Sequence, residues 1–188
     1  HAGTALWVRG CLGDAADPSP AAAGLELDCG GVRGIRGDAP FALGRADAAV
    51  ANYASALRGR ETTKSIAGFV QTFVAAKLDG VDEDVRAIAI RALSTPWSRP
   101  ARLAMACIRV IANGAEIRAS IKRAWNAWPS RLTSRELFFD GRGAVFDDVL
   151  LRTLLGTAPV CDLPMERFLT LARHALLDDA TAESGRLS

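Results

Sequence analysis

The chain has 188 residues, of which 49% are hydrophobic, 23% charged and 6% aromatic. This composition is typical of one ordinary folded domain with attachments, and it excludes a disordered or fibrous chain. The formal net charge is +2, from 23 basic and 21 acidic residues. Because the basic residues are interspersed with acidic ones, we find no phosphate-binding stripe and expect no nucleic-acid partner.

The sequence has no long apolar run and no signal-peptide layout, so we expect no transmembrane segment. It begins with His1 rather than Met, which predicts a processed, tagged or excised piece. The cysteines contain no CxxC pair, which excludes a zinc knuckle or a thioredoxin-like site. They are Cys11, Cys29, Cys107 and Cys161. We interpret them as buried or free thiols in a reducing cytosol, and therefore predict a cytoplasmic protein.

Residues 1–44 form a segment rich in Gly, Ala and Pro, with only short apolar patches. Glycine contributes no side-chain burial and loses the most entropy on ordering, so this segment cannot build a core of its own. We expect an irregular but ordered arm that lies against a helical body or a partner chain.

Within this arm, Leu25–Gly31 superficially resembles the strand and glycines that open a nucleotide or S-adenosylmethionine pocket. Such a pocket needs glycines that lead directly into a helix. Here the glycines run into Asp38-Ala39-Pro40 instead, which favours an ordinary loop. A small-molecule site over residues 25–37 stays open as an alternative.

From Arg45 onward the apolar spacing is helical almost throughout. Helices are predicted over Ala46–Leu57, about Thr63–Leu78, from Asp82 to the break at Thr95-Pro96-Trp97, from the cap Ser98 to Asn113, over a fifth that ends before Pro129, over about Ala144–Leu155, and from the cap Asp162 to about Leu176. Short connections favour antiparallel neighbours. The predicted fold class is all-α, an orthogonal helical bundle or a short helical-repeat solenoid with a Gly/Ala-rich irregular N-terminal arm.

Several polar residues have a structural interpretation. Thr133-Ser134-Arg135-Glu136 fits a capping box that begins a short helical turn. His174 is expected to be solvated or ion-paired, because no nucleophile motif is present for it to serve. The pairs Asp147-Asp148 and Asp178-Asp179 point to different sides of a helix, so we expect solvated faces and no metal site.

The tryptophans carry two interpretations. Trp125 and Trp128 fall on the apolar stripe of the fifth helix, which predicts that they fill the core. The alternative is an aromatic peptide-binding groove, which requires exposed rings beside arginines. The candidate partner-binding residues are Trp97, Arg99, Arg102 and Arg131.

The segment Gly44–Leu57 places Gly44, Ala49, Tyr53 and Ala56 at small and aromatic packing positions. It resembles the second helix of a tetratricopeptide repeat, a protein-interaction module. This resemblance divides the chain into the arm 1–44, a degenerate half repeat 45–62 and a helical accessory domain 63–188.

Further motifs lie between about Gly68 and Asp178. They are Gly68-Phe69-Val70-Gln71, the run Arg91–Pro100, the run Ala127–Leu132, Glu136-Leu137-Phe138 and the run Ala158–Thr170. This part resembles the helical segment between tetratricopeptide repeats and the class I S-adenosylmethionine-dependent methyltransferase domain of proteobacterial multidomain proteins. The cofactor-binding glycines of that family come after this segment. The resemblance therefore implies a methyltransferase context and gives no catalytic residue in this chain.

We thus expect a non-catalytic helical domain that binds or positions a protein partner, with no catalytic, cofactor-binding or metal-binding residue of its own. One alternative is a methyltransferase or other small-molecule enzyme that uses residues 25–37. Another is a structural subunit of a multi-chain complex.

Overall fold

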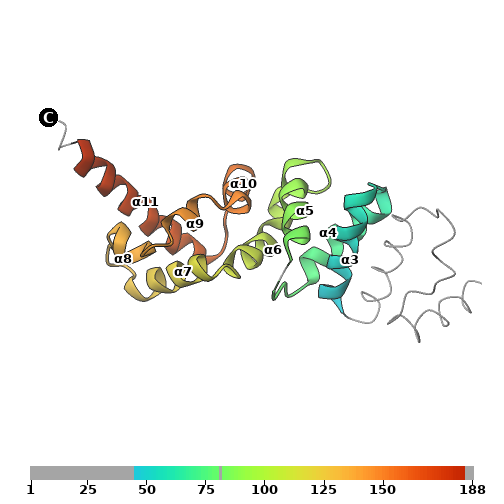
Figure 1. Cartoon of the computed structure of the whole chain (residues 1–188), viewed down its shortest axis with the longest axis horizontal. Coiled ribbons are helices and arrows are strands. Elements are labelled where there is room, and N and C mark those ends of the chain that lie inside the picture. Colours follow the sequence, from blue (N-terminus) through green and yellow to red (C-terminus); the bar gives the residue numbers. More distant parts are fainter. Residues whose placement is uncertain (1–44, 81, 185–188) are drawn as a thin grey trace, which may run out of the picture.

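The computed structural model describes residues 45–80 and 82–184, and regular structure within these ranges is entirely helical (Figure 1). The helices are α3 (Ala46–Gly59), α4 (Thr63–Ala75), α5 (Glu83–Ser94), α6 (Pro100–Ala112), α7 (Ala115–Ala127), α8 (Ser134–Phe138), α9 (Arg142–Phe146), α10 (Val149–Thr157) and α11 (Leu163–Ser184). The predicted all-α class is confirmed. The expected arm 1–44 and the candidate segment 25–37 lie outside the described residues.

The predicted helix at Thr63 begins where expected but ends earlier. Thr62 accepts a hydrogen bond from the Ser65 backbone N–H at 3.1 Å, and Ser65 Oγ accepts one from the Thr62 N–H at 3.0 Å. This capping box satisfies two N–H groups that the helix leaves unpaired. α4 ends at Ala75 because the backbone turns extended at Ala76. Leu78 is buried in the following loop rather than on the helix.

Helices α3 to α6 contact one another in several pairs. α3 packs against α4 and also against α5, while α4 packs against α6. α10 then packs on both α5 and α6. The N-cap of α6 is Arg99 with Pro100 in the first turn, so the expected cap at Ser98 is wrong by one residue. Proline fits there because its missing N–H has no partner in the first turn of a helix.

The single helix expected over Ala144–Leu155 is wrong, because the chain forms two helices there. α9 ends at Phe146, and α10 begins after Asp148, whose carboxylate accepts a hydrogen bond from the Leu151 N–H at 2.8 Å. Asp148 also forms an ion pair with Arg86 of α5. The expectation of a solvated Asp148 is therefore wrong, since its side chain is 8% exposed.

The molecule is elongated, with α3 and α4 towards one end and the C-terminal part of α11 projecting at the other (Figure 1). The first half of α11 packs on α7 and α8. Its cap is Asp162, as predicted, which accepts a hydrogen bond from the Met165 N–H at 2.9 Å. The helix continues to Ser184, beyond the expected end at about Leu176. Leu176 is half-buried and Leu177 is exposed.

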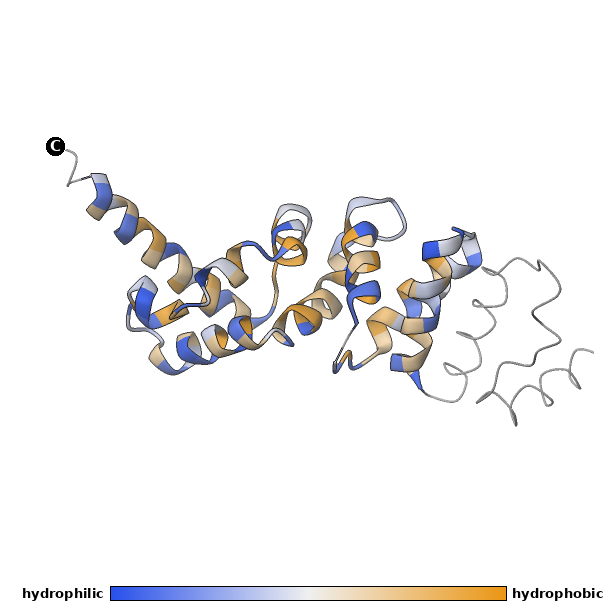
Figure 2. Ribbon diagram, in the orientation of Figure 1, coloured by the Kyte–Doolittle hydropathy of each residue, from blue (hydrophilic) through white to orange (hydrophobic). Residues whose placement is uncertain are grey.

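One apolar core runs through these helices, from Val50 to Ala175. Orange and blue segments alternate along the helices in Figure 2, as expected for helices that bury one face. Phe138 of α8 joins the core at the C-terminal end. Its ring centroid lies 5.1 Å from that of Phe146 and 6.2 Å from that of Phe168, both in edge-to-face geometry.

Candidate functional site

Two tryptophans at the end of α7 lie on the surface. Trp125 is 44% exposed and Trp128 is 40% exposed, so the prediction that they fill the core is wrong. The buried stripe of α7 runs through Ile117, Ser120 and Ala124 instead. Residue 125 lies about 100° around the helix from residue 124. Trp128 is the residue at which α7 ends, so helical spacing no longer sets its direction.

Arg167 of α11 packs on both rings. Its guanidinium carbon lies 4.3 Å from the Trp125 ring centroid and 5.4 Å from that of Trp128. A cation held over an aromatic face is attracted by the ring quadrupole, by about 0.5–1 kcal/mol at exposed sites. We call Trp125, Trp128 and Arg167 the Trp–Arg cluster. Because α11 packs along α7, the cluster is held by two helices.

One hydrogen-bond donor of the Arg167 side chain has no acceptor among the described residues. This donor is the buried Nε. One turn before it, Leu163 is 53% exposed and begins α11. The cluster therefore combines flat aromatic rings, a cation and a neighbouring aliphatic side chain, which is a surface suited to contact with another macromolecule.

The predicted partner-binding residues fall in two places. Arg99 and Arg102 are exposed at the start of α6, next to the loop that holds Trp97. Arg131 is exposed between α7 and α8. α6 and α7 follow one another along the long axis of the molecule (Figure 1). The segment after α7 that holds Arg131 therefore lies apart from the start of α6, which holds Arg99 and Arg102.

Trp97 itself is half-buried and packs against the core. Arg91 of α5 places its guanidinium carbon 5.4 Å from the ring centroid, and it also forms an ion pair with Glu61. The cation that packs on this ring is thus Arg91. None of the predicted arginines packs on an aromatic ring in the described part of the chain.

A further exposed aromatic side chain, that of Phe139, was not predicted from the sequence. Phe139 follows α8 and is 67% exposed, with a positive φ of 51°. Arg123 lies over its ring at 5.1 Å and also donates to the Leu137 carbonyl. The signal was the pair Phe138-Phe139, because adjacent helical residues cannot both face the same core.

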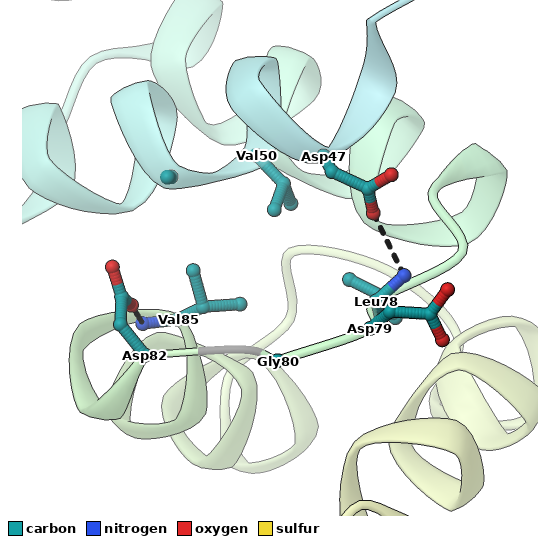
Figure 3. Close-up of a pocket in the computed structure, with 8 residues that line it drawn as sticks. Asp47, Val50, Leu78, Asp79, Gly80, Asp82 and Val85 are labelled. Atoms are coloured by element: carbon teal, nitrogen blue, oxygen red, sulfur yellow. Dashed lines mark hydrogen bonds between the residues drawn. The ribbon is translucent and has the colours of Figure 1, made fainter.

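A small cavity of about 110 Å³ lies between α3 and the start of α5, with Val50 and Val85 facing each other across it (Figure 3). Asp47 there accepts a hydrogen bond from the Leu78 N–H at 2.7 Å, and Asp82 accepts one from the Val85 N–H at 2.9 Å. Pockets for metabolites usually hold about 300–1,000 Å³. This cavity is smaller than such pockets, and the carboxylates of Asp47 and Asp82 are engaged by backbone N–H groups of the fold.

The remaining titratable side chains considered in the sequence have structural roles or stand at the surface. His174 is half-buried on α11. Asp179 accepts hydrogen bonds from Ser134 Oγ at 2.6 Å and from Arg142 at 3.0 Å, so it links α11 to α8 and α9. In residues 45–80 and 82–184, no three or more His, Cys, Asp or Glu side chains are grouped so that they could hold a metal ion. Over the same residues, no helix combines the length and the apolar character needed to cross a bilayer.

Comparison of the chain with protein-family models, with curated proteins and with solved structures finds no match.

Proposed function

We propose that this chain is a non-catalytic helical module that binds a protein partner through the Trp–Arg cluster. The observation that carries the proposal is the pair of tryptophans, each about two-fifths exposed, held in place by one arginine from a second helix. Trp and Arg are the side chains most enriched among residues that dominate binding energy at protein interfaces. A preordered cluster also loses little side-chain entropy on binding.

The arrangement of α3 to α6 is consistent with this role. α3 packs against α4 and α5, and α4 packs against α6. Contacts between every second helix of this kind are expected for stacked helical repeats. Ala49, Tyr53 and Ala56 are buried, as a tetratricopeptide-like half repeat over 45–62 requires. The resemblance of residues 68–178 to a helical segment next to a methyltransferase domain supports a position in a larger protein or assembly with a methyltransferase.

Site-specific photo-crosslinking in cells of the source organism tests the proposal. A photoreactive phenylalanine analogue at position 128 should capture one dominant protein. The matched control is the same analogue at Leu155 of α10, which is 46% exposed and lies away from the cluster. Equal capture from both positions contradicts the proposal.

The captured protein then serves as the ligand in calorimetric titrations. Changing Trp125 and Trp128 together to Ala should weaken its binding by about 30-fold or more, as expected for residues that anchor an interface. The melting temperature should change little because both rings are surface residues. A variant that binds normally would overturn the role of the cluster.

Trp97 offers a second anchor. Trp97→Ala should weaken capture of the partner more than it lowers the melting temperature if the ring is part of the interface, together with Arg99, Arg102 and Arg131. Equal losses would assign Trp97 to the core, in keeping with its half-buried position. Titration with S-adenosylmethionine should give no heat, and micromolar binding would favour the enzyme alternative.

A further inference from the structure

Charge is distributed unevenly along the helical part of the chain. Between Ser98 and Arg135 the sequence has seven Arg and one Lys against a single acidic residue, Glu116. Between Glu136 and Ser184 it has nine acidic residues against four arginines. The expectation that basic residues are interspersed with acidic ones therefore does not hold in this segment, which forms α6 and α7 and is strongly basic.

Some of these basic side chains are used within the fold. Arg109 donates to the Val74 carbonyl at 2.9 Å, and Arg123 donates to the Leu137 carbonyl at 2.8 Å. Arg118 and Lys122 differ, because both are exposed and neither forms an ion pair in the described part of the chain. Their charges are available to a ligand.

Arg118, Lys122 and Trp125 occupy positions i, i+4 and i+7 of α7. This spacing places the three side chains in a row on one face of a helix. Trp125 ends the row, and Arg167 of α11 packs on its ring. The exposed face of α7 therefore carries two cations that lead to the Trp–Arg cluster.

We propose that this face binds an acidic segment of a partner protein, with the carboxylates on Arg118 and Lys122 and an apolar side chain on Trp125. The inference rests on the proposed function and names the chemistry of its partner. Charge complementarity carries it: a row of unpaired cations next to an aromatic anchor fits a ligand that alternates carboxylates with apolar groups.

A protein segment fits this face better than a nucleic acid does. Single-stranded nucleic acids stack their bases on open aromatic faces, whereas the rings of Trp125 and Trp128 are already in contact with Arg167.

Fluorescence anisotropy with a labelled synthetic peptide tests the inference. The probe is a peptide of about 16 residues that alternates Glu with Leu, and the competitor is a single-stranded oligothymidine of equal charge. We expect saturable peptide binding that weakens as salt rises from about 50 to about 200 mM, because exposed charges are screened. Tighter binding of the oligothymidine would overturn the proposal in favour of a nucleic acid.

Charge reversal locates the binding face. Arg118→Glu with Lys122→Glu should weaken peptide binding by about tenfold or more. The matched control, Arg152→Glu with Lys77→Glu, changes the net charge equally at two exposed positions outside α7, and it should weaken binding less than about twofold. Equal losses in the two variants, or no peptide binding by the unaltered chain, would overturn the inference.

The same variants separate this inference from the proposed function. If the protein captured at position 128 still binds Arg118→Glu/Lys122→Glu normally but is lost with the two Trp→Ala changes, the interaction role stands and the acidic segment is wrong. If the Trp→Ala changes have no effect on that protein, the proposed function fails first.

Discussion

Gly68 of α4 lies directly against the ring of Tyr53 of α3. A Cβ added to Gly68 would fall 2.8 Å from the Tyr53 Oη and closer still to Cζ. The ring is 2% exposed, so it has no free space into which to move. This contact explains a glycine in the middle of a helix, where it otherwise costs stability relative to alanine. It sets how closely α3 and α4 approach.

Gly68→Ala should therefore destabilise the protein. We expect the free energy of unfolding to fall by about 1–3 kcal/mol, the usual cost of overpacking a core. Urea denaturation measures it. The control is Gly156→Ala in α10, where an added Cβ meets no atom within 4 Å. There the better helix propensity of alanine should leave stability unchanged or raise it by up to about 1 kcal/mol. Similar losses in both variants would contradict the packing argument.

Asp148 carries two stabilising contacts, the cap of α10 and the ion pair with Arg86. Asp148→Ala removes both and leaves Arg86 without its partner, so we expect a loss of roughly 2–4 kcal/mol in the free energy of unfolding. Asp148→Asn keeps a side chain that caps helices well and should cost less. Chemical denaturation of the two variants tests this order, and equal losses would show that only the charge matters.

The two described cysteines should differ in reactivity. Burial raises the pKa of the Cys107 thiol to about 12, so at pH 8 it is protonated as well as covered. Cys161 is exposed. In a variant with Cys11 and Cys29 changed to Ser, a thiol reagent should modify one residue quickly, and mass spectrometry should place the label on Cys161. Rapid labelling of Cys107 in the native protein would show that the core opens around it.

The cap of α8 should make stability depend on pH. The pKa of the Glu136 carboxyl is lowered by two hydrogen bonds that it accepts from Thr133. The larger effect comes from the Thr133 backbone N–H and the smaller from the Thr133 side chain. A carboxyl whose pKa is lower in the folded state stabilises it above the unfolded pKa and loses this effect as pH falls through the folded value.

Glu136→Gln isolates this charge, because glutamine also serves in capping boxes. The unaltered protein should be the more stable of the two at pH 7, and the difference should shrink as pH falls below about 4, the ordinary range for Glu. Urea midpoints measured across this range check it. A difference that stays constant with pH would exclude an ionised Glu136 as the cause.

The candidate site was predictable only in part. The sequence suggested that Trp and Arg side chains could form an anchor. It assigned Trp125 and Trp128 to the core, and the partner-binding residues it indicated were Trp97, Arg99, Arg102 and Arg131. The arginine that packs on the exposed rings is Arg167, which is distant in the sequence. Helical periodicity cannot find such a pair, because it compares residues only within one helix.

Local chemistry in the sequence determined the all-helical class, most helix positions and the caps at Thr62, Asp82, Thr133 and Asp162, since each depends on residues within a few positions of one another. The tertiary structure alone decided that Asp148 pairs with Arg86, that Phe139 is exposed and that Trp125 meets Arg167. An apolar stripe shows that one face of a helix will be buried against another helix. It does not show which helix that will be, or which aromatic rings stay exposed, because both depend on how helices distant in the sequence pack together.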